Sequence, residues 1–531
     1  MTAAMAIALG AGWTPAWGQT APPPAPAKAA EGPAQPRVLD IEEFRVEGAD
    51  LLSGLEVEAA LTPFIGKGRP LEDVEKARAA LEKAYTDRGY QTVVVAIPPQ
   101  TVRGGVVTLK VTEGKVGRLR VNGAHWFSPF EIKRLAPSVQ EGKVPNFNEL
   151  AEDIVVLNQW PDRRVTPAIR PGSEPGTVDV DLNVQETFPL HGSLELNNRY
   201  SVNTVHLRTN GAIRYDNLWQ LGHSLGFSFQ VAPKRPKDAL VFAGNYLARF
   251  PGAPWFTLAF NGVIQDSDVS TLGGTAVRGR GRIFGTRAVA NLPGSTEFFH
   301  ALSVGLDYKL FLEDISLGES AQSTPVHYWP MTFQYGGTAL GRYTQTAFSL
   351  SAVFNLRGLS SDDIAFDSKR YKASASFIYF RGDLAHTQNL PADLQLFFKV
   401  SGQWAPDPLV GPEQFTAGGA ESVRGYLEVE ASGDFGALGS FELRSPSLTR
   451  WLGPTVTDWR FYVFTEGGRV WIHDALPEQK VFYTLWSAGG GTRFRLWDHL
   501  SGTLDVGVPL SSAGPTPKYQ PRIHFRLAGE F

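Results

Sequence analysis

From residue 189 to the C-terminus, apolar and polar side chains alternate with a period of two. Clear examples run from Leu225 to Val231, from Phe348 to Leu356 and from Leu394 to Val400. A strand with one apolar face and one wet face produces this pattern. We count sixteen such segments, at 190–200, 205–215, 222–232, 239–248, 255–265, 276–291, 298–311, 326–335, 342–356, 370–383, 392–404, 437–447, 459–471, 481–496, 499–508 and 521–531.

The connectors between these segments differ in length. Several are short, with the sequences RFPGAP, LPGSTE and GGTALG, whereas those at 266–275, 312–325, 357–369 and above all 405–436 are long. A soluble β-sandwich also alternates, but short turns on one side and long loops on the other are typical of a bacterial outer-membrane barrel. We therefore predict a mainly β chain whose residues 189–531 form a 16-stranded antiparallel transmembrane β-barrel. Its lumen would admit water or a threaded chain.

Two smaller α+β modules are predicted before the barrel. Over 38–114 we expect the order strand, helix, helix, strand, strand, with a single strand at Ile41–Val46. The second helix has Leu71, Val74, Ala77, Leu81 and Ala84 on one face and ends at Arg88-Gly89. The same order repeats over 115–188, where Ser128 and Asn146 are the expected helix caps.

Composition narrows the class of protein. At 531 residues the chain is too long for one ordinary domain, and charged residues are only 19%. No stretch approaches the ~20 apolar residues that a membrane-spanning helix needs. The net charge of -3 gives no reason to expect nucleic-acid binding. The absence of cysteine excludes disulfides, thiolate metal sites and cysteine nucleophiles, and it suits an exported protein.

The N-terminal segment is typical of export. Residues 1–18 predict a signal peptide, with an apolar run at 1–11 and small residues at Ala16 and Gly18. The basic region that opens such signals is missing, which indicates a truncated or misplaced start. Residues 19–37 form a Pro/Ala-rich linker that cannot build a core.

The strongest chemical signal lies in the longest connector. The tetrapeptide Val423-Arg424-Gly425-Tyr426 interrupts the Gly-rich stretch 405–436, and Phe464-Thr465-Glu466-Gly467-Gly468 follows about forty residues later. An arginine in a loop and a carboxylate on a later strand predict a charge-assisted lock inside the barrel. The alternative is a loop arginine and a solvated carboxylate with no mutual contact.

These motifs resemble the outer-membrane transporters of two-partner (type V) secretion, the ShlB-FhaC-HecB haemolysin secretion/activation family of the POTRA-containing barrel superfamily. In that family the sixth extracellular loop folds into the lumen and carries the VRG[YF] tip, which matches Val423–Tyr426. The family motif F-x-D-x-G falls on Phe464, Glu466 and Gly468. Because Glu466 stands where the family usually has Asp, the resemblance implies a slightly shifted loop tip.

The two α+β modules show a resemblance to the same family. Residues 38–114 and 115–188 look like POTRA 1 and POTRA 2, and VVLNQWPDRRVTPAIRPGSEPGTVDVDLNV resembles the second POTRA domain of this family. Exposed edge strands in such modules accept an extended client chain through backbone hydrogen bonds. Alternation toward the terminus at Phe525, Leu527 and Phe531 resembles the signal that barrel-assembly machinery recognises.

The resemblance thus implies an outer-membrane pore with periplasmic POTRA domains. It would pass an unfolded partner, a large adhesin- or haemolysin-like exoprotein, to the cell surface. The expected further partners are outer-membrane lipid and the barrel-assembly machinery. We expect no nucleic acid, nucleotide, cofactor, metal site or catalytic residue. The scattered histidines His223, His300, His327 and His473 fit lumen or interface positions better than ligand positions.

Three other functions fit part of the pattern. A relative that inserts barrel proteins into the membrane usually carries more POTRA copies than the two predicted here. A passive porin explains the barrel but neither the modules nor the VRGY loop. An esterase would rest on Gly222-His223-Ser224-Leu225-Gly226, which matches G-x-S-x-G. That motif needs a strand-to-helix turn, and a strand follows here, so we interpret the match as chance.

Overall fold

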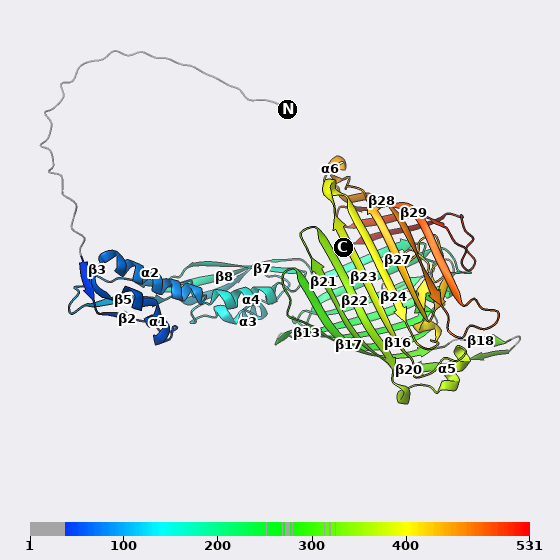
Figure 1. Ribbon diagram of the computed structural model, residues 1–531, viewed down its shortest axis with the longest axis horizontal. Coiled ribbons are helices and arrows are strands. Elements are labelled where there is room, and N and C mark those ends of the chain that lie inside the picture. Colours follow the sequence, from blue (N-terminus) through cyan, green and yellow to red (C-terminus); the bar gives the residue numbers. More distant parts are fainter. Residues whose placement is uncertain are drawn as a thin grey trace, which may run out of the picture. The chain divides into compact units, whose positions relative to one another are not determined.

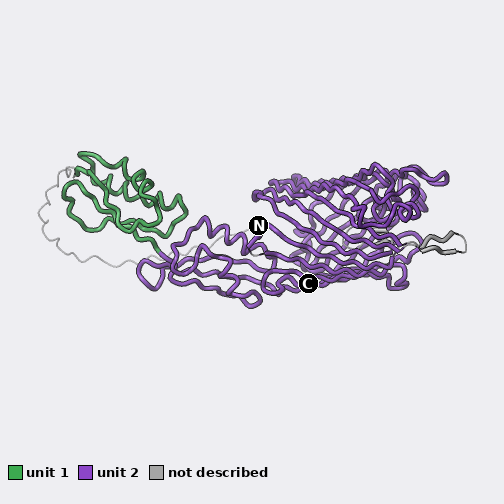
Figure 2. The backbone as a smooth tube through the Cα atoms, turned by 90° about the horizontal axis from the view of Figure 1, so that it is seen from below, with its two compact units in different colours: residues 1–114 green, residues 115–531 purple. Residues whose placement is uncertain are grey.

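The computed structural model describes residues 38–531 except 251, 268, 271–276, 279, 313, 318–319 and 324. The predicted signal peptide (1–18) and linker (19–37) lie outside the described residues. The chain divides into two compact units, residues 1–114 and 115–531 (Figure 2).

The first unit is an α+β module with two small sheets. Strand β5 (Val106–Glu113) pairs in parallel with β2 (Glu43–Glu47) and antiparallel with β4 (Val93–Ala96). The helices are α1 (Gly54–Leu61) and α2 (Leu71–Asp87), and Ser53 opens α1 through a reciprocal capping box with Glu56. Helix α2 buries Val74, Ala77 and Leu81. This core fixes the three-stranded sheet against the helices.

Three details of the first unit differ from the sequence prediction. The single strand expected at 41–46 is two strands, β1 (Val38–Ile41) and β2, because β1 turns away to pair with β3 (Gly66–Pro70). That third strand had been missed, since GKGRP shows no apolar alternation. Leu71 is exposed, and Tyr85 is buried in place of Ala84.

The second unit begins with a module of the same pairing pattern. Strand β8 (Thr177–Glu186) pairs in parallel with β6 (Lys115–Asn122) and antiparallel with β7 (Arg163–Pro171). Helices α3 (Pro129–Arg134) and α4 (Phe147–Leu157) pack on it around Ile132, Leu157 and Val180. The Asn146 side chain caps α4 as predicted. Ser128 is the N-cap residue of α3, as predicted, but its side chain makes no capping hydrogen bond.

The barrel closes as predicted, with sixteen antiparallel strands in which the last pairs with the first (Figure 1). The eighth strand is interrupted at Trp329, so β20 and β21 are two parts of one strand paired with β17. The strands are β9 (Leu190–Asn197), β10 (Arg208–Leu218), β11 (His223–Val231), β12 (Leu240–Phe250), β13 (Ala253–Asp266), β16 (Gly281–Asn291), β17 (Phe298–Phe311), β20 (Val326–Tyr328) with β21 (Pro330–Leu340), β22 (Thr344–Asn355), β23 (Ile378–Asn389), β24 (Gln395–Trp404), β27 (Phe435–Arg444), β28 (Val456–Trp471), β29 (Phe482–Leu496), β30 (Leu500–Pro509) and β31 (Arg522–Glu530).

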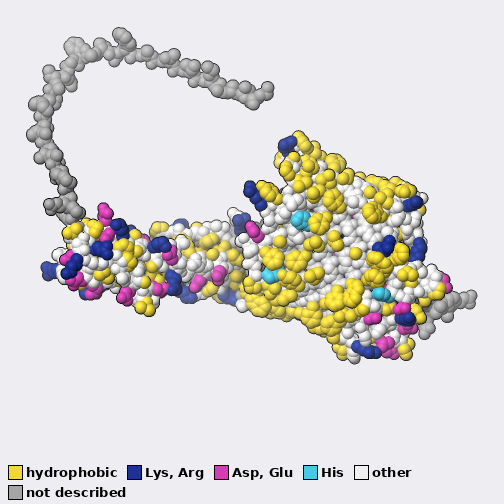
Figure 3. All heavy atoms as spheres, viewed as in Figure 1, with side chains coloured by type: hydrophobic (Ala, Val, Ile, Leu, Met, Phe, Trp, Pro, Cys, Tyr) yellow, Lys and Arg dark blue, Asp and Glu magenta, His cyan; other side chains and the backbone are white. Residues whose placement is uncertain are grey.

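The outer face of the barrel is apolar. Phe227, Phe284, Leu350 and Phe441 are all exposed, and each lies on the face that alternates with the wet lumen side. Figure 3 shows hydrophobic side chains spread over the barrel wall and few charges among them. Such a band is the surface that faces lipid in outer-membrane barrels. Among the helices that the structure describes, none is both long and apolar enough to cross a bilayer.

The connectors opposite the module end carry their own structure. Between β22 and β23 lie η5 (Arg357–Leu359) and helix α5 (Asp363–Lys369), after which residues 370–377 run back to the wall. Phe366, Ala375 and Phe377 form a buried core there with Leu409 and Val410. The extracellular rim is thus packed like a small domain, and it covers the base of the connector 405–434.

Two barrel predictions were misplaced. The segment expected at 370–383 is a strand only from Ile378 to Asn389, because the alternating residues before it bury themselves in the rim core. The short connector GGTALG belongs mostly to β21, and the actual turn is at 341–343.

Candidate functional site

The predicted loop 405–436 lies between the eleventh and twelfth barrel strands, β24 and β27. It contains η7 (Gly411–Glu413) and a short hairpin of β25 (Phe415–Ala417) with β26 (Ala431–Gly433). Its tip is folded against the barrel wall, where Val423 and Tyr426 are completely buried. The loop therefore occupies the lumen.

Arg424 joins the loop tip to the thirteenth strand. Its backbone N–H donates to Glu466 Oε2 (2.7 Å), and its guanidinium Nε and Nη2 both donate to Glu466 Oε1 (3.0 and 2.5 Å). The two carboxylate oxygens thus have different roles, one toward the loop backbone and one toward the guanidinium, so Glu466 fixes both the chain path and the side chain of Arg424.

Two further carboxylates complete the site. Arg424 Nη2 donates to Glu442 Oε1 on β27 (2.7 Å), and Nη1 donates to Asp505 Oδ1 on β30 (3.2 Å). All four side chains are at least nine-tenths buried. Glu442 also accepts from Arg444 (2.9 Å) and Arg493 (3.1 Å). Three guanidiniums thus face three carboxylates, and this balance makes the burial of so many charges tolerable.

Aromatic rings enclose the guanidinium. The Cζ of Arg424 lies 3.6 Å from the centroid of the Phe464 ring, within the range of a cation–π contact. Tyr462 donates its hydroxyl to Asp505 Oδ1 (2.6 Å), so it orients that carboxylate toward Arg424. Phe464 and Glu466 are two residues apart on β28 and therefore share its inner face.

Gly425 allows the tip to touch the wall with its backbone. Its φ of +95° is unfavourable for residues with a Cβ. A Cβ on Gly425 would come within 3.1 Å of the Gly507 carbonyl, and one on Gly507 would come within 2.6 Å of the Gly425 nitrogen. The Gly425 N–H donates to His524 Nε2 on the last strand (2.9 Å). Two glycines thus permit a backbone contact that side chains would separate.

Tyr426 anchors the other side of the tip. Its hydroxyl donates to the Ser511 carbonyl (2.6 Å), and it accepts from the Trp486 backbone N–H (3.1 Å). The ring lies in a buried cluster with Val423, Val470 and Leu485. Gly468, the last residue of the predicted strand motif, lies against Ala437 of β27 rather than at the guanidinium. The structure thus brings together Val423, Arg424, Gly425, Tyr426, Phe464 and Glu466.

The base of the loop is held by different groups. The carboxylate of Glu413 accepts from Lys309 Nζ (2.6 Å) and from the hydroxyls of Tyr328 (2.6 Å) and Tyr379 (2.8 Å). Burial alone would raise the pKa of Glu413. The charge of Lys309 and these hydrogen bonds outweigh burial and hold the pKa below its usual value of 4.5.

Asp434, at the other end of the loop, ties together the rim segments. Its fully buried carboxylate accepts from the backbone N–H groups of Leu409 (2.8 Å) and His473 (2.7 Å) and from Arg370 Nη2 (3.1 Å). One side chain thereby links three extracellular connectors.

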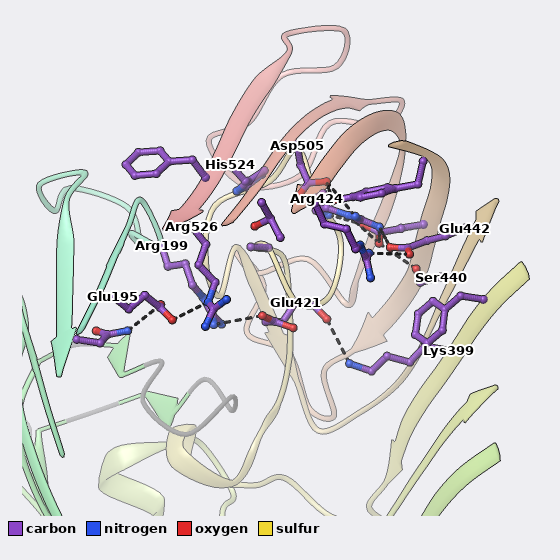
Figure 4. Close-up of a pocket in the computed structure, with 18 of the residues that line it drawn as sticks. Glu195, Arg199, Lys399, Glu421, Arg424, Ser440, Glu442, Asp505, His524 and Arg526 are labelled. Carbon is purple, nitrogen blue, oxygen red and sulfur yellow. Dashed lines mark hydrogen bonds and ion pairs between the residues drawn. The ribbon is translucent and has the colours of Figure 1, made fainter. Parts of the chain in front are cut away.

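A charged cavity of about 620 Å³ lies beside the latched tip. Figure 4 shows the cluster of Arg424, Glu442 and Asp505 in it and, apart from this, a second group in which Arg526 donates to Glu195 (2.6 Å). Arg199 extends this second group to the loop, because its Nε donates to Glu428 (3.0 Å). The lumen is therefore polar and charged next to the loop.

The remaining sequence candidates lie elsewhere. Phe525, Leu527 and Phe531 belong to the closing end of the barrel, where the Phe531 backbone exchanges two hydrogen bonds of 3.0 Å with Gly192. Ser224 is buried in strand β11 and accepts from Arg249 Nη1 (3.0 Å), so no strand-to-helix turn presents it. The geometry of an esterase nucleophile is not formed there.

Sequence reasoning missed Glu442, Asp505, Gly507 and His524. They come from three different strands, and only the closed sheet brings them to the tip. The available signal was the pair Glu442-x-Arg444 on the wet face of a strand next to the F-x-E motif.

Comparisons with known proteins agree with this geometry. Residues 39–114 match the ShlB-type POTRA domain, and residues 340–494 match the haemolysin secretion/activation protein ShlB/FhaC/HecB. Two separate stretches of the chain are thus similar to models of this transporter family. The second match spans β22 to β29 and so contains the loop, Arg424 and Glu466.

Full-length relatives support the assignment. The chain is 26% identical over 512 residues to the outer membrane transporter CdiB of Escherichia coli, covering 92% of this chain and 81% of that protein. It is 24% identical over 510 residues to CdiB of Dickeya dadantii (strain 3937), covering 89% and 83%. The solved structure of Escherichia coli CdiB has the same fold, with a TM-score of 0.64 at 21% identity over 96% of this chain and 93% of that one.

Proposed function

We propose that this outer-membrane transporter passes an unfolded partner exoprotein from the periplasm to the cell surface, with the loop 405–436 as its gate. The observation that carries the proposal is the closed barrel whose lumen holds this loop, latched by Arg424 to three strands. A porin needs no such latch.

In this mechanism the two α+β modules, 38–114 and 115–188, act as POTRA domains in the periplasm. The edge strands of their sheets are β2 and β4 and β6 and β7, and a client strand can add through backbone hydrogen bonds where the edge is not already bonded, as Val116 of β6 is to residues 142–143. The client then enters the lumen as the loop tip moves aside. We infer that folding of the client outside the cell gives the passage its direction.

The other partners belong to the same proposal. The apolar barrel face would contact outer-membrane lipid. The C-terminal strand with Phe525, Leu527 and Phe531 would be the segment that barrel-assembly machinery recognises during insertion. The client would be a large adhesin- or haemolysin-like protein. The transporter itself would have no enzymatic activity.

The test is export of a cognate exoprotein in cells that express the wild type, Arg424→Ala or Arg287→Ala. Arg287 is a matched control, since it is a lumen arginine of β16 whose nearest carboxylate, Asp307, is 3.9 Å away. We expect secretion with the wild type and Arg287→Ala, and a loss of about tenfold or more with Arg424→Ala at equal barrel insertion. Normal secretion by Arg424→Ala would remove the latch from the mechanism.

An assembly factor is the second candidate, because this superfamily fold also serves barrel insertion. If the wild type is inserted but exports nothing, the same cells should be assayed for the amount of folded barrel proteins in their outer membrane. A fall in that amount on depletion of this chain would favour the assembly function over transport.

A further inference from the structure

Three potential metal ligands converge where the second module joins the barrel. Asp162 precedes β7 of the module, whereas His191 and Asp216 lie on β9 and β10, the first two barrel strands. His191 Nε2 lies 2.9 Å from Asp162 Oδ1 and 3.6 Å from Asp216 Oδ2. One ligand atom from each residue falls within 4.8 Å of the other two. The cluster therefore spans the junction of two structural parts of the second unit.

Two polar atoms in the cluster are buried without a hydrogen-bond partner among the residues that the structure describes. They are Asp162 Oδ2 and His191 Nε2. The Asp162 side chain is only 5% exposed, and its carboxylate points at the imidazole. The 2.9 Å contact between them is not aligned as a hydrogen bond, so it does not satisfy Nε2. An imidazole nitrogen and a carboxylate oxygen without hydrogen-bond partners are ligand atoms that a cation can take.

The surroundings are organised like the outer shell of a metal site. Thr187 donates its hydroxyl to Asp162 Oδ1 (3.3 Å), and the Asp216 backbone N–H donates to the Pro189 carbonyl (2.9 Å), which fixes the chain just before His191. Arg214 Nε donates to Asp216 Oδ2 (2.7 Å), and Arg249 is within electrostatic reach of Asp216. Both arginines lie near Asp216, whereas the only ion pair that Asp162 makes among the described residues is with His191.

We propose that Asp162, His191 and Asp216 bind a divalent first-row transition-metal ion, with Zn²⁺ as the best fit, and that this ion clamps the second module to the barrel mouth. Imidazole with two carboxylates is a ligand set that suits Zn²⁺, whereas Ca²⁺ and Mg²⁺ prefer oxygen alone. In a tetrahedral zinc site the ligand atoms are about 3.4 Å apart. The separations of 2.9 and 3.6 Å bracket that value.

The clamp would add to contacts that already hold the joint, where the ring of Phe188 lies between those of Trp126 and Tyr215. Asn217, near the end of β10, and Gln220, in the turn after it, both donate to the Trp126 carbonyl of the module (3.1 Å each). An ion bound by one module residue and two barrel residues adds a cross-link beside them. The bound ion would stiffen the joint whichever client the barrel carries.

The first test is zinc titration of the untagged full-length protein in detergent micelles, followed by calorimetry. We expect one Zn²⁺ per chain, and binding at least ~10-fold weaker in Asp162→Asn and in His191→Gln. His300→Gln is the matched control, because His300 lies in β17 with Tyr335 as its partner (3.1 Å). This control should bind like the wild type. The proposal is overturned if zinc does not bind, or if Asp162→Asn and His191→Gln bind as tightly as the wild type.

The second test measures how rigidly the second module is held to the barrel. Because the chain has no cysteine, spin labels at Glu152→Cys in the module and Tyr343→Cys in a barrel turn report one distance. Both variants replace surface residues away from the cluster. We expect Zn²⁺ to narrow the distance distribution in this labelled protein and to leave it unchanged when Asp162→Asn is added. An unchanged distribution in the presence of bound zinc would overturn the clamp.

Discussion

The two ends of loop 405–436 are held by opposite chemistry. At the tip, the loop supplies a cation, Arg424, and the barrel supplies three carboxylates. At the base, the loop supplies an anion, Glu413, and the barrel supplies Lys309 and two tyrosine hydroxyls. The tip also touches the wall through bare backbone at Gly425, whereas the base lies against a core of aromatic and aliphatic side chains.

Because of this difference, the two ends of the loop should be released in different ways. Removal of Arg424 leaves an excess of buried negative charge, so the tip is either latched or strongly destabilised. If the Glu413–Lys309 ion pair is lost, the tyrosine hydroxyls still bind a neutral carboxyl or amide, so the base weakens by degrees. Since arginine stays protonated at all ordinary pH values, loss of a proton from the guanidinium cannot open the tip. We infer that the base is the fixed end and the tip the moving end.

Arg424→Gln should have the largest effect. It removes the charge while keeping an amide of moderate length, and it leaves Glu442, Glu466 and Asp505 facing only Arg444 and Arg493. We expect a loss of about 3–5 kcal/mol in the stability of the latched tip. Hydrogen exchange over residues 418–430 should become much faster in this variant. If exchange at the tip stays as slow as in the wild type, the charge cluster does not hold the loop.

Glu413→Gln should have a smaller effect, confined to the base. It keeps the hydroxyl contacts but loses the ion pair with Lys309, at a cost of about 1–3 kcal/mol. Exchange should accelerate at residues 409–414 while residues 418–430 remain protected. Faster exchange at the tip in this variant would show that the two ends of the loop are coupled. It would contradict the separate release of tip and base.

The same residue predicts a response to acid. Because the pKa of Glu413 is lower in the folded state than its usual 4.5, its contribution is complete above about pH 4.5 and is lost as the pH falls through the folded value. Relative to the intrinsic rate at each pH, hydrogen exchange at residues 409–414 in the wild type should therefore become faster below pH 4.5. In Glu413→Gln, which cannot titrate there, this acid-dependent rise should be absent.

Glu466→Asp should have the smallest effect of these variants, and it tests how Glu466 positions the tip. The shorter carboxylate cannot hold the Arg424 backbone N–H and guanidinium in their present places at once, so one hydrogen bond should lengthen. We expect a change of at most about 1 kcal/mol, with export retained. Complete loss of export would show that the methylene of Glu466 sets the position of the tip.

Much of the fold could be predicted because the barrel repeats one simple pattern. The strand from Phe298 to Phe311 has the predicted bounds, since larger apolar and small or polar side chains alternate along its middle, from Leu302 to Lys309. Residues 370–377 misled the prediction because Tyr371, Ala373, Ala375 and Phe377 also alternate. Ala373, Ala375 and Phe377 are buried in the rim core instead of facing the lipid, and a period of two cannot distinguish these environments.

The site was predictable only in part. Val423–Tyr426 and Phe464–Gly468 stand out as short motifs, and the arginine and carboxylate they carry are in contact. Glu442, Asp505 and Gly507 carry no motif, and their positions depend on strand register across four strands of a closed sheet. His191 gave no signal at all, because its neighbours Asp162 and Asp216 are brought to it by the joint between module and barrel.

The carboxylate of Asp434 has a consequence for how the cell surface is recognised from outside. It binds Leu409, Arg370 and His473, which belong to three separate extracellular connectors. The exposed residues of these connectors therefore present one composite antigenic face. Antibodies against isolated loop peptides should therefore bind the intact transporter poorly. A bacteriophage that binds this composite face should no longer bind the Asp434→Ala variant.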